Sequence, residues 1–168
     1  MYLLLPYREE GNPPVLRPTV DVRLEHGDTG DWTLRALIDT GAPITVFDRG
    51  AADAIGVRFG YFGAETGMIR ILGGHWAAQF ETIQLSLTAD PEYSWTARAA
   101  FIRSPDLQMP FQGLLGTEGF LDKFAVTFNK YYDYLVLERP DDFHDRIGAP
   151  LATDPVYDPD PQWERPGD

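Results

Sequence analysis

The chain has 168 residues, no cysteine and a formal net charge of −12, because 26 acidic residues outnumber 14 basic ones. This length fits one domain with a sizeable core, and the lack of cysteine excludes disulfides, thiolate nucleophiles and thiolate metal sites. The negative charge argues against a nucleic-acid partner, whose phosphates bind basic surfaces.

Residues 1–17 are interpreted as an N-terminal extension without an export signal. The apolar run in MYLLLP lacks a basic flank and is far too short for the core of a signal peptide. No later stretch is long and apolar enough to span a bilayer. We therefore expect a cytoplasmic protein with no membrane partner.

Between residues 18 and 138 apolar residues recur with a period of two, which is typical of strands with one buried face. Two short helices are expected between the strands, one over 48–55 ended by Gly56 and one over 118–124 with Thr117 as its N-cap. The pattern predicts an all-β fold over residues 18–139, a single-lobe and partly closed barrel with one or two short helices. The clearest alternations are Val20, Val22 and Leu24, then Ile83, Leu85 and Leu87, then Trp95, Ala97 and Ala99.

The strand expected to end at Ile38 drives a carboxylate, Asp39, into the interior. Residues 36–38 are apolar, and Asp39-Thr40-Gly41 forms a tight turn directly after them. A buried, unpaired carboxylate is costly, so its placement here indicates a function. Thr40 offers a hydroxyl that can bond to backbone, and Gly41 lets another main chain or a substrate come close. We identify Asp39, Thr40 and Gly41 as candidate functional residues.

A second Asp-Thr-Gly, at residues 28–30, is interpreted as a turn. It lies in a polar, glycine-rich connection between two predicted strands, 19–24 and 32–38. Glycine and aspartate satisfy the backbone demands of a hairpin at such a place. Asp28 and Asp39 are expected at opposite ends of one strand, so they cannot serve one site.

Another hairpin is expected to join residues 68–72 to 76–80, with Gly73-Gly74 near its tip. Glycines supply the positive φ angles of a tight hairpin, and this requirement alone explains them.

Residues 140–168 then form an acidic, proline-rich tail with six prolines, eight acids and two arginines. We interpret the tail as an extended, solvated appendage. The alternative is a segment that docks on the body or on a partner.

Three features in order resemble the retropepsin-like aspartic proteases, in particular their bacterial and retroposon-like branch. They are Asp39-Thr40-Gly41-Ala42, Gly73-Gly74 and Leu114-Leu115-Gly116, and the resemblance spans about residues 18–138. It implies an acid-protease-like barrel in which Leu114-Leu115-Gly116 threads beside the aspartate turn. It also implies that the hairpin at Gly73-Gly74 is a mobile flap that closes on an extended peptide.

The resemblance implies an aspartic endopeptidase that works as a homodimer without metal or cofactor. The chain is too short for two lobes, so a second copy must supply the other Asp39. Two close carboxylates share a proton, and the ionised one activates the water that attacks the peptide bond. In this family the Thr40 hydroxyl would bond across the dimer axis, and Gly41 would bond to substrate. The residues expected to bind substrate are Ala42, Ile44, Ile71, Leu72, Gly73, Gly74 and Leu114.

The chain also departs from the viral pattern. Viral members usually have acidic residues after the Asp-Thr-Gly-Ala and a pairing arginine at the start of the later helix, whereas this chain has Pro43-Ile44 and Thr117. Two alternatives therefore remain: a non-catalytic dimerisation or peptide-binding module on the same fold, and a structural β domain in which Asp39 caps a turn. A Ser/His/Asp hydrolase is not supported, since no Gly-x-Ser-x-Gly turn is present. A metal site at residues 141–145 is less supported than a solvated charge run.

Overall fold

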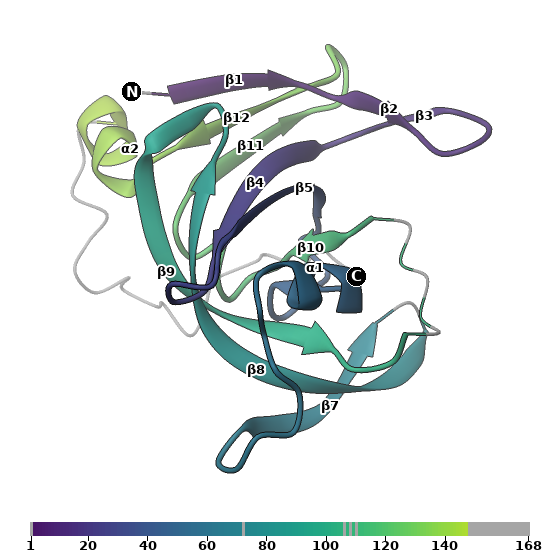
Figure 1. Ribbon diagram of the computed structural model, residues 1–168. Helices are drawn as coiled ribbons and strands as arrows, with labels where there is room; N and C mark the ends of the chain where they lie inside the picture. The colour runs from purple at the N-terminus through teal and green to yellow at the C-terminus, as the bar shows by residue number, and fades with distance from the viewer. Residues whose placement is uncertain (1, 72, 106, 108, 110, 148–168) are drawn as a thin grey trace, which may run out of the picture.

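The computed structural model describes residues 2–71, 73–105, 107, 109 and 111–147, which form a mostly β structure with two short helices (Figure 1). The elements are β1 (Tyr2–Pro6), β2 (Arg8–Glu10), β3 (Val15–Arg17), β4 (Thr19–Glu25), β5 (Asp31–Ile38), β6 (Val46–Phe47), α1 (Arg49–Ala54), β7 (Glu65–Ile71), β8 (Gly74–Leu87), β9 (Asp90–Ile102), β10 (Gly113–Leu115), β11 (Ala125–Asn129), β12 (Tyr134–Glu138) and α2 (Pro140–Ile147).

Six strands form a closed barrel in the order β4, β5, β10, β6, β9 and β8, because β8 also pairs with β4. The all-β barrel predicted from the sequence is therefore confirmed, and its closure is complete. The alternating apolar residues named above on β4, β8 and β9 are all buried. Burying a large apolar side chain contributes about 1.5–3 kcal/mol, so this alternation supplies much of the force that closes the barrel.

Strand β10 organises one end of the barrel. It runs parallel to β5, with Leu115 beside Ile38, and antiparallel to β6, with Gly113 beside Phe47. Parallel strands bring their carboxyl ends to the same edge. The residues that follow β5 and β10 therefore come together at this end.

The hairpin of β7 and β8 extends the sheet beyond the closed barrel. Ile71 pairs with Gly74, and Gly73 turns the chain with a φ of 76°, which glycine adopts at little cost. The second half of β8 continues into the barrel, where it pairs with β4 and β9. The predicted hairpin is thus an arm of the barrel and is continuous with its wall.

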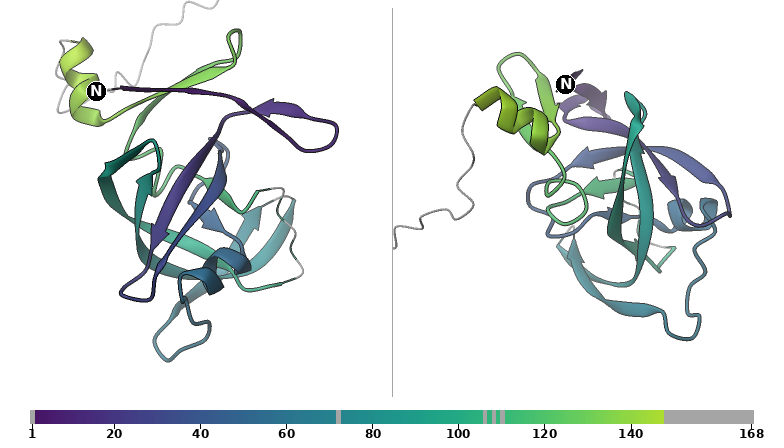
Figure 2. Two further views of the ribbon diagram at one scale, coloured as in Figure 1. Left: turned by 45° about the horizontal axis from the view of Figure 1, so that its top comes forward. Right: turned by 90° about the vertical axis from the view of Figure 1, so that its left-hand side faces the viewer.

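A three-stranded sheet in the order β1, β12, β11 lies beside the barrel, and β2 and β3 form a separate projecting hairpin (Figures 1 and 2). Leu135 and Leu137 of β12 are buried, and Leu3 and Leu5 of β1 pack against the same core. The N-terminal segment interpreted as an extension is therefore paired with the last strand of the domain.

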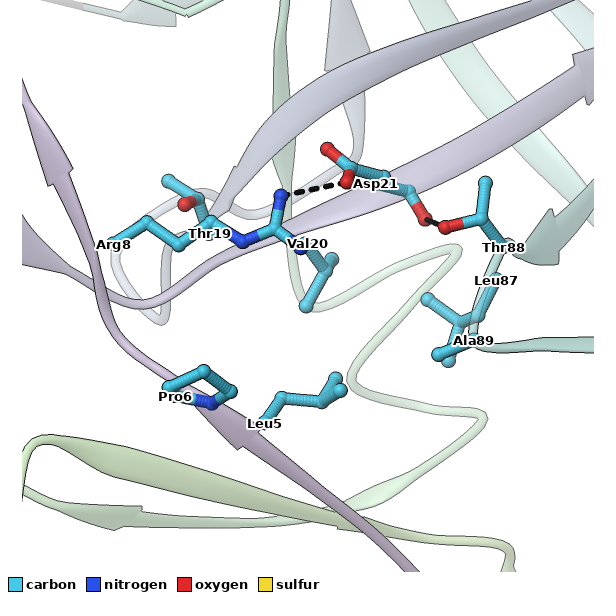
Figure 3. A pocket seen from close by; sticks show the side chains of 9 residues that line it. All are labelled: Leu5, Pro6, Arg8, Thr19, Val20, Asp21, Leu87, Thr88 and Ala89. Carbon is cyan, nitrogen blue, oxygen red and sulfur yellow. Dashed lines mark hydrogen bonds and ion pairs between the residues drawn. The ribbon is translucent and has the colours of Figure 1, made fainter.

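A pocket of about 30 Å³ lies where β1 meets β4 (Figure 3). Arg8 donates a hydrogen bond to the Asp21 carboxylate at 2.6 Å beside it, and Arg35 donates another to the same group at 3.1 Å. This volume has room for about one or two water molecules and for no larger ligand. We interpret the pocket as a small packing gap between the N-terminal strands and the barrel.

The first expected helix is present as α1. The side chain of Asp48 caps it by accepting from Ala51 N–H at 2.8 Å, and Gly56 follows its last turn. The Asp28-Thr29-Gly30 segment is a turn between β4 and β5, as predicted, and the Thr29 hydroxyl donates to main-chain carbonyls of His26 or Ile55, each at 2.6 Å.

The second expected helix, over 118–124, does not form, and residues 117–123 make successive turns instead. Gly119 has a φ of 95°, which is incompatible with a right-handed helix. Two bonds hold this conformation: the Trp95 indole N–H donates to Gly119 O at 2.8 Å, and Gly119 N–H donates to the Asp122 carboxylate at 2.9 Å. A buried tryptophan on another strand therefore overrides the local helical pattern.

The start of the tail is also different from the expectation, because residues 140–147 form helix α2. Pro140 stands at the first position, where its missing N–H costs nothing, and Asp141 and Asp142 in the first turn favour the helix dipole. The remainder of the predicted extended tail, residues 148–168, lies outside the described residues.

Candidate active site

Asp39 is held by main-chain hydrogen bonds at the end of β5. Its N–H donates to the carbonyl of Leu115 at 3.0 Å, and its own carbonyl accepts from Ala42 N–H at 3.1 Å. The carboxylate oxygen Oδ1 accepts from Gly41 N–H at 2.9 Å. The turn therefore fixes the carboxylate in one direction without using a second side chain.

The turn lies at the rim of the barrel. Asp39 is half-buried, while Thr40 and Gly41 are exposed. The expectation of a carboxylate driven into the interior is therefore wrong for the single chain. The apolar strand ends at the buried Ile38, and the tight turn then carries the chain outward.

The main chain after β10 passes directly against this turn. A Cβ on Gly116 would lie 2.5 Å from Ile44 O and 2.7 Å from Ala42 O, so only glycine fits. Thr117 N–H donates to Ala42 O at 2.9 Å, and Gly116 N–H donates to the buried hydroxyl of Thr45 at 3.2 Å. Leu114-Leu115-Gly116 therefore threads beside the aspartate turn, as the sequence resemblance implies.

A pocket of about 370 Å³ opens between the aspartate turn, β10 and the β7–β8 hairpin. It brings together six predicted residues: Asp39, Gly41, Ala42, Ile71, Gly73 and Leu114. These residues come from segments as far apart in the sequence as Asp39 and Leu114, so the barrel topology assembles the pocket. The lining is mostly apolar or glycine, which suits the side chains and main chain of a peptide.

The structure does not bring every expected residue to the pocket. Ile44 is buried and packs in an apolar cluster with Val46 and Ile102, because its segment bridges to Glu118 in the parallel direction. Thr40 and Gly74 adjoin lining residues in the chain but do not line the pocket themselves. Leu72 lies outside the described residues.

Gly74 lies against Trp76 at the base of the hairpin tip. A Cβ at position 74 would lie 2.8 Å from the indole nitrogen of Trp76. That indole nitrogen is buried and has no hydrogen-bond partner among the described residues. Trp76 packs with the apolar cluster beneath the hairpin together with its cross-strand neighbour Ile69. The contact with Trp76 therefore favours glycine at position 74, whereas the positive φ of the turn falls on Gly73.

Sequence reasoning missed Arg70, which lines the pocket beside Ile71. The signal for it was a single cation inside the otherwise apolar run Met-Ile-Arg-Ile-Leu. Alternation along a strand normally sends such a charge to solvent. Its place here follows from the fold, which brings the end of β7 to the pocket that contains Asp39.

An ion-pair network ties the hairpin to the barrel. Arg98 on β9 pairs with Glu65 at the start of β7 and with Glu118 at 3.3 Å, and its guanidinium lies over the ring of Phe80 at 4.2 Å. The hydrogen bond from Arg98 lowers the pKa of Glu65. The network joins the start of β7 to the segment that follows β10.

No protein-family model and no curated protein matches this chain. Among the described residues, no helix has the length and the apolar character that crossing a bilayer requires.

Proposed function

We propose that the chain is an aspartic endopeptidase that acts as a homodimer, with Asp39 of each protomer activating the water that hydrolyses a peptide bond. One observation carries the proposal. Asp39 is fixed by its own turn at the mouth of an apolar pocket, beneath a hairpin tipped with glycine. Among the described residues that line this pocket, Asp39 is the only carboxylate, so chemistry that uses two carboxylates needs a second copy.

In the proposed dimer the two Asp39 carboxylates lie within hydrogen-bonding distance. Like charges that close cannot both ionise, so the pair shares one proton. The ionised member takes a proton from the bound water as the water attacks the carbonyl carbon. The protonated member stabilises the developing oxyanion, and a proton is then delivered to the departing nitrogen.

The exposure of the turn supports this arrangement. Thr40 and Gly41 are exposed in the single chain, and no described residue bonds to the Thr40 hydroxyl. In the dimer this hydroxyl would bond to the partner's turn and hold the two carboxylates in one plane. The backbone of Gly41 would then face the substrate main chain.

The proposed contact between protomers differs from an exchange of terminal strands. Strand β1 pairs along its full length with β12 of the same chain, with Tyr2 beside Glu138 and Pro6 beside Tyr134. The edge of β1 that faces β12 is therefore occupied within the same chain. We place the two-fold axis at the aspartate turns instead.

The decisive experiment compares the aspartates of the two Asp-Thr-Gly sequences in the chain, Asp39 and Asp28. Asp39→Asn should abolish cleavage of a peptide library and leave the oligomeric state unchanged in analytical ultracentrifugation. Asp28→Asn is the matched control, because Asp28 also precedes Thr-Gly but lies in the β4–β5 turn; its activity should equal that of the wild type. Undiminished cleavage by Asp39→Asn would refute the proposal.

A second candidate is a peptide-binding module that does not cleave. It is favoured by positions 43 and 44, where an exposed proline and a buried isoleucine offer no carboxylate to hold a substrate main chain. This candidate requires that the wild type bind peptides but cleave none between about pH 4 and pH 7, where a shared-proton pair is competent.

A further inference from the structure

Arg70 is the cation of the candidate active site. It lines the pocket that also contains Asp39, and it lies on β7 next to Ile71. Among the described residues of the lining it is the only cation, and the remainder apart from Asp39 are glycine, alanine, isoleucine and leucine. The pocket therefore combines apolar contact with a single positive charge.

Arg70 has no carboxylate partner in the described part of the chain. Arg98, the neighbouring arginine below the hairpin, pairs with two acids, Glu65 and Glu118. On β5, Arg35 likewise pairs with Asp21. In a chain with 26 acidic residues and 14 basic ones, carboxylates are abundant. Like Arg17, Arg58 and Arg103, Arg70 pairs with no described acid, but among these four only Arg70 lines the pocket of Asp39, where its guanidinium is available to a ligand.

His75 adds a second group to the same face of the hairpin. It lies directly opposite Arg70 in the β7–β8 register, and both side chains are exposed. Residues directly opposite in an antiparallel pair project to the same side of the sheet. Nitrogen donors of two side chains thus stand together, and a guanidinium binds a carboxylate with two parallel hydrogen bonds.

We infer that Arg70 makes the site select peptides that carry an aspartate or glutamate near the cleaved bond. This inference rests on the proposed function and names its substrate class. Glycine at the hairpin tip can bond to any peptide main chain, so the tip does not discriminate between sequences. Arg70 supplies the discrimination, because its charge is matched only by an acidic side chain.

The two-fold axis of the proposed dimer adds a constraint. Each protomer brings its own Arg70 to the shared cleft, one on each side of the scissile bond. The acidic preference must therefore occur at two positions placed symmetrically about the cut. A library of peptides digested by the wild type and sequenced by mass spectrometry reads this pattern directly.

The test uses pairs of peptides that differ only by glutamate or glutamine at the preferred position. The wild type should cleave the glutamate peptide with a kcat/KM about two- to fivefold higher, the range expected of a partly solvated ion pair. Arg70→Gln should cleave the two peptides equally, and Arg70→Lys should retain part of the preference. Arg23→Gln is the matched control, since it removes the same charge from an exposed position on β4; it should keep the full preference.

Two outcomes overturn the inference: an unchanged preference in Arg70→Gln, or an equal loss of kcat/KM on both peptides, which would mean that Arg70 acts on the reaction itself.

Fluorescence anisotropy separates this failure from failure of the proposed function. Asp39→Asn, with and without Arg70→Gln, is titrated with both peptides. The titration also covers the case in which the wild type cleaves neither peptide. In that case, tighter binding of the glutamate peptide by Asp39→Asn that is lost when Arg70→Gln is added supports the role of Arg70. Equal binding of the two peptides, or no binding, refutes it.

Discussion

The main chain of Gly116 touches the carbonyl of Ile44 so closely that a Cβ at position 116 would lie 2.5 Å from that oxygen. The contact locks the segment after β10 against the aspartate turn. Both partners are backbone, so neither can move aside as a flexible side chain could.

Gly116→Ala should therefore destabilise the protein by about 3 kcal/mol, the upper part of the range for overpacking a well-packed site. Urea unfolding followed by tryptophan fluorescence measures the loss. Gly50→Ala is the control, because its Cβ would meet only the Asp48 carboxylate at 3.4 Å, in the first turn of α1. That variant should be as stable as the wild type or slightly more stable.

Trp95→Phe should lower the free energy of unfolding by about 1–2 kcal/mol. The substitution keeps an aromatic ring beside Phe120 and Phe124 but removes the buried bond from the indole N–H to Gly119 O, so a buried carbonyl loses its partner. Trp32→Phe, at a residue that is 44% exposed, is the control and should change stability little. Equal effects of the two substitutions would show that the bond to Gly119 contributes nothing.

Much of the site is predictable because its parts are local. The apolar run into Asp39, the glycine turn at Gly73 and the segment that ends at Gly116 each carry their own signal, and the structure brings all three to one pocket. The barrel class is predictable for the same reason, since alternation along each strand marks its buried face.

The sequence predictions are wrong or incomplete where contacts with residues distant in the sequence determine the local structure. Ile44 is in the core because its segment bridges to Glu118, a pairing that no local pattern shows. The helix expected over 118–124 is replaced by turns that Trp95 holds from another strand. Arg70 was missed for a similar reason: the alternation of β7 predicts that it faces away from the core, but not that the end of this strand lines the pocket that contains Asp39.

Acid should weaken the junction between the N-terminal strand and the barrel. Burial raises the pKa of Asp21, but hydrogen bonds from Arg8 and Arg35 outweigh it and hold the pKa below its usual range. A carboxyl group with a lowered pKa in the folded state contributes stability above its unfolded pKa of about 3.9, and this contribution is lost as the pH falls through the folded value.

Asp21→Asn should accordingly cost about 0.5–1 kcal/mol at pH 7, because both arginine partners are more than a third exposed, and nothing at a pH below both pKa values. Urea unfolding at pH 7 and near pH 2 gives the comparison. Asp31→Asn serves as the control, because Asp31 pairs with Arg23 while half of its side chain is exposed; its cost should be small at both pH values. A cost of Asp21→Asn that persists in acid would contradict the ion-pair explanation.

Mixing active and inactive chains tests whether one site needs two protomers. If each site contains Asp39 from both protomers, wild type mixed with an equal amount of Asp39→Asn and left to exchange should lose roughly half of its activity, because wild-type chains are drawn into one-aspartate dimers. Addition of Asp28→Asn in the same amount should instead raise the activity, since that chain retains Asp39. A monomeric enzyme would keep its full activity in the first mixture. The activities of the two mixtures therefore report whether each site contains one or two Asp39 carboxylates.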